Sequence, residues 1–159
     1  MKLNSIWACV QLGRPSDSAL ALVGTYVGAR LAGVSDPTFA AVTAVAVSNG
    51  LLSAASMIFN DWHDVVEDRI NRPDRPIPSG RVTRHRALVM STVLFPLAVA
   101  AAAPAGAGFA IAAAAVATAS VVYTVRIKAV PWVGNGLAAL LSSYPLWCWM
   151  PLAERPGSL

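Results

Sequence analysis

The chain has 159 residues, of which 56% are hydrophobic and 13% are charged, and its formal net charge is +4. Because soluble domains usually carry about 25% charged residues, this composition excludes an ordinary soluble domain and predicts a membrane protein. The positive charge does not predict nucleic-acid binding, because the arginines cluster in one loop between apolar segments without a basic aromatic surface.

Five apolar segments approach the ~20 residues that a helix needs to cross a bilayer. They cover residues 18–34, 37–59, 87–103, 107–125 and 132–152, and the first is short and contains Arg30. The sequence therefore predicts an all-α integral membrane protein. We expect a bundle of about five transmembrane helices, forming one membrane domain over residues 1–159.

The basic residues are distributed unequally between the two sides of these predicted helices. Ten of them fall on one side: Lys2, Arg14, six arginines in the connection 61–86, Arg126 and Lys128. Only Arg155 lies clearly on the other side. Because positive charge favours the cytoplasmic side, we expect a multi-pass protein of the cell membrane, with its N-terminus and polar connection in the cytoplasm and its C-terminus outside.

An acidic motif follows the second apolar segment. Asp61, Asp64 and Asp68 are spaced three and then four residues apart, which on one helix would place the carboxylates on one face. Like charges repel, so the pattern predicts a cation between them, with Mg²⁺ as the first candidate. Asn60 is expected to cap the helix end, where its amide oxygen could join a metal shell or only hydrogen-bond the backbone. A solvated acidic face is the alternative, but the neighbouring transmembrane helix favours a functional site.

Three arginines follow the acidic motif at three-residue steps, and a proline comes directly after the second and after the third of them. They are Arg69, Arg72 and Arg75, and the prolines are Pro73 and Pro76. Proline interrupts a regular helix, so we expect a structured loop that folds back. Guanidinium groups suit phosphate oxygens. Arg72 is favoured as a phosphate contact, and topology-setting charge is the alternative.

A second polar segment begins at Tyr123 and carries Lys128 on the same predicted face as the acidic motif. Lys128 could neutralise a diphosphate opposite the metal, and Arg14 could join the same site. These parts fit the ionisation of an allylic diphosphate, in which metal ions and cationic side chains stabilise the departing diphosphate. The carbocation would then need the dry, apolar chamber that a helix bundle provides.

The motif Asn60-Asp61-x-x-Asp64-x-x-x-Asp68, followed by Asn71-Arg-Pro-Asp-Arg-Pro-Ile-Pro-Ser-Gly80, resembles the first aspartate-rich motif of the UbiA-type intramembrane prenyltransferases. Tyr123-Thr-x-x-x-Lys128, Gly134-Asn135 and Arg14-Pro15 resemble further signatures of that superfamily. The resemblance implies transfer of a prenyl group from an isoprenyl diphosphate to a lipophilic acceptor within the membrane. The acceptor is often aromatic, such as a hydroxybenzoate, homogentisate or naphthoate, and in other members it is haem, a chlorophyllide or a glyceryl phosphate.

The resemblance also implies roles for particular residues. The expected Mg²⁺ ligands are Asn60, Asp61, Asp64 and Asp68, of which Asp64 and Asp68 are the expected catalytic residues. The expected diphosphate contacts are Arg72, Lys128, Asn60, Arg14 and Tyr123.

One departure from the family is clear in the sequence. The family fold has about nine transmembrane helices and a second aspartate-rich motif, whereas after Asp74 the only acid here is Glu154. We therefore expect the chain to correspond to the first part of that fold and to be incomplete relative to the family. A second chain that supplies the missing motif, a non-catalytic lipid- or diphosphate-binding protein, and a UbiA-type terpene cyclase are the alternatives.

Overall fold

The computed structural model describes residues 3–33 and 39–150, and every regular element there is helical. The α-helices are α1 (Leu3–Leu12), α2 (Pro15–Leu31), α3 (Phe39–His63), α4 (Val65–Asn71), α5 (Arg84–Ala102), α6 (Ala107–Val122) and α7 (Val133–Trp147). A 3₁₀ turn, η1 (Ala103–Ala105), links α5 to α6. A π-helical turn, η2 (Tyr123–Ile127), extends α6.

The five predicted apolar segments correspond to α2, α3, α5, α6 and α7, so the all-α prediction is confirmed. Among the described residues, three helices are long and apolar enough to cross a membrane: Phe39–His63, Arg84–Ala105 and Ala107–Ile127. Helices α2 and α7 have 17 and 15 residues, so they are shorter than the ~20 residues of a typical span. The predicted segment ends at Val34, Pro37 and Leu152 lie outside the described residues.

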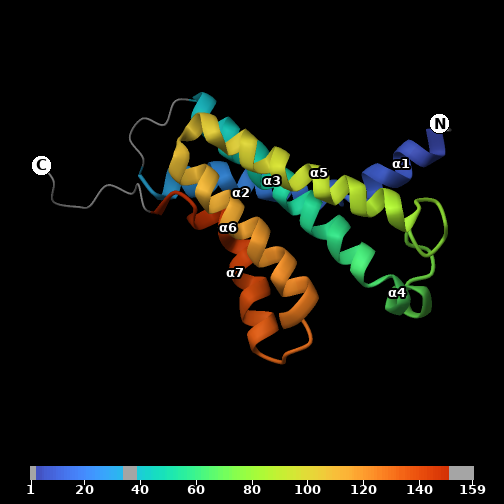
Figure 1. Ribbon diagram of the computed structural model, residues 1–159. Coiled ribbons are helices and arrows are strands. Elements are labelled where there is room, and N and C mark those ends of the chain that lie inside the picture. The colour runs from blue at the N-terminus through green and yellow to red at the C-terminus, as the bar shows by residue number, and fades with distance from the viewer. Residues whose placement is uncertain (1–2, 34–38, 151–159) are drawn as a thin grey trace, which may run out of the picture.

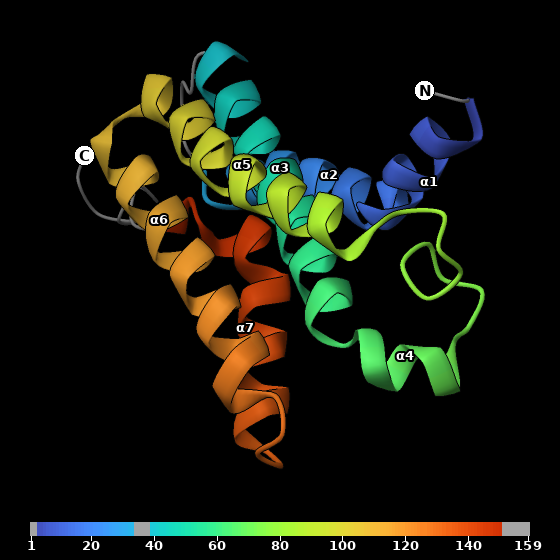
Figure 2. The ribbon, with the colours of Figure 1, turned by 45° about the vertical axis from the view of Figure 1, so that its right-hand side comes forward.

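Helix α3 is the centre of the bundle. Helix α5 runs antiparallel along it, and α2 packs on another side (Figures 1 and 2). Helices α6 and α7 form an antiparallel hairpin that projects away from this layer (Figure 2). The polar turn between α6 and α7 and the short helix α4 therefore both lie at the end of the bundle where α3 finishes.

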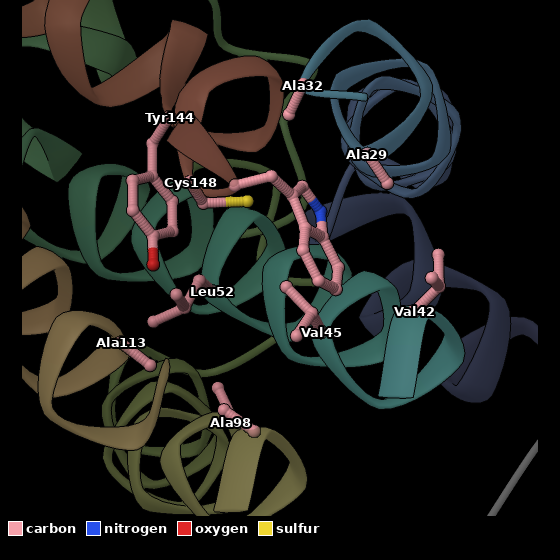
Figure 3. Close-up of a cluster of buried hydrophobic side chains, with 11 residues drawn as sticks. Ala29, Ala32, Val42, Val45, Leu52, Ala98, Ala113, Tyr144 and Cys148 are labelled. Carbon is pink, nitrogen blue, oxygen red and sulfur yellow. The ribbon is translucent and has the colours of Figure 1, made fainter. Parts of the chain in front are cut away.

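The main core cluster joins α2, α3, α5, α6 and α7 (Figure 3). Its members are mostly small, such as Ala29, Ala98 and Ala113, and Tyr144 and Trp149 fill the larger spaces. Small residues allow membrane helices to approach closely. The closest approach is at Gly28, where an added Cβ would lie 2.4 Å from the Leu146 carbonyl oxygen.

Two features near the polar end differ from the predictions: an additional helix, α1, and the end of α3. Helix α1 buries Ala8 and Leu12 in a second cluster, together with Ile58, Val65 and residues of the loop after α4. The helix that carries Asn60 continues to His63, so the expectation that Asn60 caps a helix end is wrong.

Candidate functional site

The acidic motif spans a break between two helices. Asp61 lies in the last turn of α3, Asp64 occupies the break with φ −85° and ψ 13°, and Asp68 lies on α4. The expectation that one continuous helix carries all three carboxylates is therefore wrong. The break directs Asp61 and Asp68 to one set of basic residues and Asp64 to another.

Asp61 is the buried centre of the first set. Its side chain is 6% exposed, and its Oδ1 accepts hydrogen bonds from Arg14 Nη2 and Arg75 Nη1, both at 3.0 Å. Arg75 Nη1 also donates to Asp68 Oδ2 at 2.6 Å. A guanidinium of the chain itself therefore bridges Asp61 and Asp68.

Asp64 belongs to the second set. Asp64 Oδ2 forms an ion pair with Lys128 Nζ and accepts from Asn60 Nδ2 at 3.0 Å. Lys128 Nζ also donates to Asn60 Oδ1 at 3.3 Å, and His63 Nδ1 lies 3.1 Å from Asp64 Oδ1. Burial raises the pKa of the Asp64 carboxyl, but hydrogen bonds from Lys128 and His63 lower it by more, so the pKa lies below its usual value.

The π-helical turn η2 delivers Lys128 to this second set. The Lys128 backbone N–H donates to the Tyr123 carbonyl oxygen at 2.9 Å, the i to i+5 bond of a π turn. Helix α7 packs directly behind it, because an added Cβ on Gly134 would lie 3.0 Å from the Ile127 carbonyl oxygen and 3.1 Å from that of Lys128. The position of Lys128 therefore depends on a close backbone contact between two helices.

Arg14 reaches Asp61 from the junction of α1 and α2. Its φ of 46° lies in the left-handed region, which costs a residue other than glycine roughly 1–3 kcal/mol. Pro15 follows at the first position of α2, where a missing N–H costs nothing. The strained backbone is thus held where the Arg14 side chain contacts Asp61.

The loop after α4 folds back, as its prolines predicted. Ile77 and Val82 are buried in the second cluster, which brings Arg75 to Asp61 and Asp68. Arg81 in the same loop donates to Gln11 Oε1 at 2.8 Å and to the Asp74 carbonyl oxygen at 2.6 Å, so the loop is tied to α1.

The structure brings together some of the predicted site residues and separates others. Arg14 contacts Asp61, which shares Arg75 with Asp68, and Lys128 contacts both Asn60 and Asp64. Arg72 lies apart from Lys128, in the lining of an open pocket beside Arg14. Tyr123 is half-buried, and within the described residues no side-chain hydrogen bond is found for it.

Arg75 is the principal residue that sequence reasoning left unassigned. It was one of three arginines at equal spacing, and local spacing alone does not reveal a contact back across 14 residues to Asp61. The two prolines, which predict that the loop folds back, were the available sign that Arg75 could return to the acidic motif.

The oxygen donors fit Mg²⁺ in the way that this ion commonly binds, through one or two carboxylates together with substrate phosphates and water. Asn60 Oδ1 and Asp64 Oδ2 already converge on one cation, the Lys128 ammonium. In the described part of the chain, no three His, Cys, Asp or Glu side chains are grouped to hold a metal ion. A complete shell would therefore need oxygens from outside these residues.

Comparisons with known proteins agree with this architecture. The UbiA prenyltransferase family model matches residues 20–153. A digeranylgeranylglyceryl phosphate synthase from Natronomonas pharaonis is 42% identical over 141 residues, which are 88% of this chain and 50% of that protein. The enzyme of the same name from Methanoregula boonei is 39% identical over 93 residues, 58% of this chain and 33% of that protein.

A solved structure, described as concerning digeranylgeranylglyceryl phosphate synthase in membranes, has the same fold with a TM-score of 0.86. It is 22% identical and is matched over 96% of this chain and 55% of that one. The chain belongs to the UbiA prenyltransferase family, whose members are integral membrane proteins with transferase activity. It spans about half, or less, of the length of the relatives that it matches.

Proposed function

We propose that this chain binds an isoprenyl diphosphate together with Mg²⁺ and acts, as the whole or part of an enzyme, in prenyl transfer within the membrane. The observation that carries the proposal is the convergence of Asn60 Oδ1 and Asp64 Oδ2 on Lys128 Nζ. Oxygen donors and a partly exposed positive charge meet there, as a metal–diphosphate complex requires.

Each residue has a defined part in this proposal. Asn60, Asp61, Asp64 and Asp68 form the candidate metal-binding set, and Asp64 and Asp68 are its catalytic members. When bound, Mg²⁺ would offset the negative charge that develops on the departing diphosphate. Lys128 is 38% exposed, so it can turn from Asp64 to a phosphate oxygen, and Tyr123 is a further candidate contact of the diphosphate. The apolar helices would exclude water from the prenyl cation.

We propose a glyceryl phosphate derivative as the acceptor. The relatives are named as synthases of a glyceryl phosphate that carries two geranylgeranyl groups. That product implies transfer of geranylgeranyl to a glyceryl phosphate hydroxyl. The family resemblance allowed a range of acceptors, many of them aromatic, and the proposal narrows this range to a lipophilic phosphate ester.

The proposal also says how the site is completed and on which side of the membrane it lies. Because the chain spans about half of its relatives, we propose that a second polypeptide segment or chain supplies the remaining metal ligands. The cluster of basic residues beside Asp61 and Asp64 supports a cytoplasmic position for the acidic motif and the N-terminus.

The test is binding of geranylgeranyl diphosphate to the purified chain in lipid nanodiscs, with and without Mg²⁺. We expect Mg²⁺-dependent binding that is lost in Asp64→Asn. Glu67→Gln is the matched control, because Glu67 is an exposed acid of α4 and has no ion pair among the described residues. Equal binding with and without Mg²⁺, or binding unchanged in Asp64→Asn, would refute the metal assignment. Transfer is then measured with a geranylgeranylglyceryl phosphate acceptor.

A further inference from the structure

An open pocket of about 720 Å³ lies between the α1–α2 junction and the loop after α4. Its lining contains four arginines, Arg14, Arg72, Arg75 and Arg81, against two acids, Asp17 and Asp74. Asn60, Asp64 and Lys128 are not part of this lining. The protein therefore has a second concentration of positive charge, distinct from the Lys128 side of the acidic motif.

Three of the four guanidinium groups are fixed by contacts within the protein. Arg14 and Arg75 are both held at 3.0 Å by the buried Asp61. Arg81 is held by Gln11 and by the Asp74 carbonyl oxygen. These groups retain unused N–H donors, because a guanidinium has five donors and the contacts use only some of them. A rigid, donor-rich wall of this kind suits an anion that presents several oxygens.

Arg72 differs from its three neighbours. Its side chain is exposed, and within the described residues it has no hydrogen bond or ion pair. A free guanidinium in the same pocket as these fixed donors can bind a planar or tetrahedral oxyanion with two parallel hydrogen bonds. The pocket thus combines three guanidinium groups that are already held in position with one, that of Arg72, that is free to move onto a ligand.

We propose that this pocket binds a terminal phosphate monoester, the headgroup of the acceptor, while the Lys128 side takes the diphosphate of the prenyl donor. The inference rests on the proposed function, because transfer from a diphosphate to a glyceryl phosphate brings two anions into one protein. Separate basic sites keep those anions apart, and Asp61 anchors two of the pocket arginines from within the acidic motif. Arg14 and Arg72, which the family resemblance assigned to the donor diphosphate, are accordingly assigned to the acceptor phosphate.

The experiment measures two ligands on the same set of variants in nanodiscs of zwitterionic lipid. Phosphatidic acid, a lipid phosphate monoester, is counted by native mass spectrometry against phosphatidylglycerol, a phosphodiester. Farnesyl diphosphate binding with Mg²⁺ is measured in parallel. Arg72→Gln should weaken phosphatidic acid binding by about tenfold or more, since a charged hydrogen-bonded pair is lost, and should leave diphosphate binding within about twofold. Lys128→Gln should weaken diphosphate binding and leave phosphatidic acid binding within about twofold.

Arg69→Gln is the matched control, because Arg69 is also an exposed arginine near the end of α4 but does not line the pocket. It should change neither affinity. Arg72→Lys should recover only part of the phosphatidic acid binding, because an ammonium cannot form the paired hydrogen bonds. Competition by free inorganic phosphate would show that the phosphate group alone is recognised, and competition only by glycerol phosphate would show that the glyceryl part contributes; both support the pocket.

Three results would overturn the inference. They are an equal loss of both ligands in Arg72→Gln, no loss of phosphatidic acid in that variant, and equal binding of the monoester and the diester. Failure of the proposed function has a different signature. A wild-type chain that holds phosphatidic acid through Arg72 but shows no Mg²⁺-dependent diphosphate binding would refute the prenyl-donor site and retain the phosphate pocket.

Discussion

Arg75 Nη1 lies 2.6 Å from Asp68 Oδ2, and the same nitrogen donates to Asp61 Oδ1 at 3.0 Å. One guanidinium therefore ties the last turn of α3 to α4 across the helix break. It also supplies the positive charge that the two carboxylates would otherwise take from a metal ion. A divalent cation at Asp68 and the Arg75 guanidinium repel each other, so binding of the cation should be coupled to release of the arginine.

The first prediction concerns this competition. Arg75→Gln removes the internal cation, so Mn²⁺ in place of Mg²⁺ should bind the chain about tenfold more tightly when no diphosphate is present. The loss of the free Mn²⁺ signal in electron paramagnetic resonance measures this affinity. Arg69→Gln makes the same charge change without a contact to the acids and should leave the affinity as it was. Equal Mn²⁺ affinity in Arg75→Gln and wild type would mean that Arg75 and the metal do not compete.

The second prediction concerns the buried carboxylate of Asp61. Asp61→Asn leaves Arg14 and Arg75 without their shared anion, and we expect a loss of about 2 kcal/mol in stability, reduced from the value for a fully buried pair because both arginines are partly exposed. Thermal unfolding in detergent measures it. Asp74→Asn, at an exposed acid in the same region, should leave the midpoint unchanged. A midpoint for Asp61→Asn that matches wild type would contradict the role of Asp61 as an anchor.

The third prediction is a pH dependence. The pKa of Asp64 is lower in the folded protein than its usual value of 3.8, so the folded state favours the ionised carboxylate. Its contribution to stability is present above pH 3.8 and is lost as the pH falls through the lower folded pKa. The stability difference between wild type and Asp64→Asn should therefore be constant near neutrality and shrink in acid. If this stability difference instead grew on acidification, the pKa of Asp64 would be raised in the folded protein and the prediction would be wrong.

The fourth prediction tests the crossing of α2 and α7. Gly28→Ala places a methyl group 2.4 Å from the Leu146 carbonyl oxygen, so the helices must separate, at a cost of about 1–3 kcal/mol. Chemical unfolding of the chain in mixed micelles gives the change. Gly108→Ala adds the same methyl group where nothing lies within 4 Å and should not be destabilising. Equal stability of the two variants would show that the helices do not pack this closely in the membrane.

Much of the fold could be predicted because apolar length is a local property of the sequence. The segments that became α3, α5 and α6 needed only their composition to be recognised as candidate spans. Helix α1 was missed because it has only 10 residues, and its reason for being helical is the burial of Ala8 and Leu12 against distant residues. A contact of that kind leaves no local pattern.

The sequence was enough to predict which residues form the candidate site, but not which of them pair with one another. The acidic motif, Lys128 and Arg14 were all found from the sequence, and the structure brings each basic residue to an aspartate. The spacing of the aspartates suggested one shared face, because spacing assumes a continuous helix. The break at Asp64 and the loop that returns Arg75 are tertiary features, and they divide the motif into two sets.

The direction of the Lys128 side chain depends on the number of residues in the π turn Tyr123–Ile127 more than on which residues they are. Removing one residue from this turn would restore ordinary α-helical winding and rotate everything after it by about 100°. Lys128 would then point away from Asp64 even if every side chain of the site were intact. This stretch should accept exchanges of exposed side chains such as Val125 readily, yet it should not accept a change in its length.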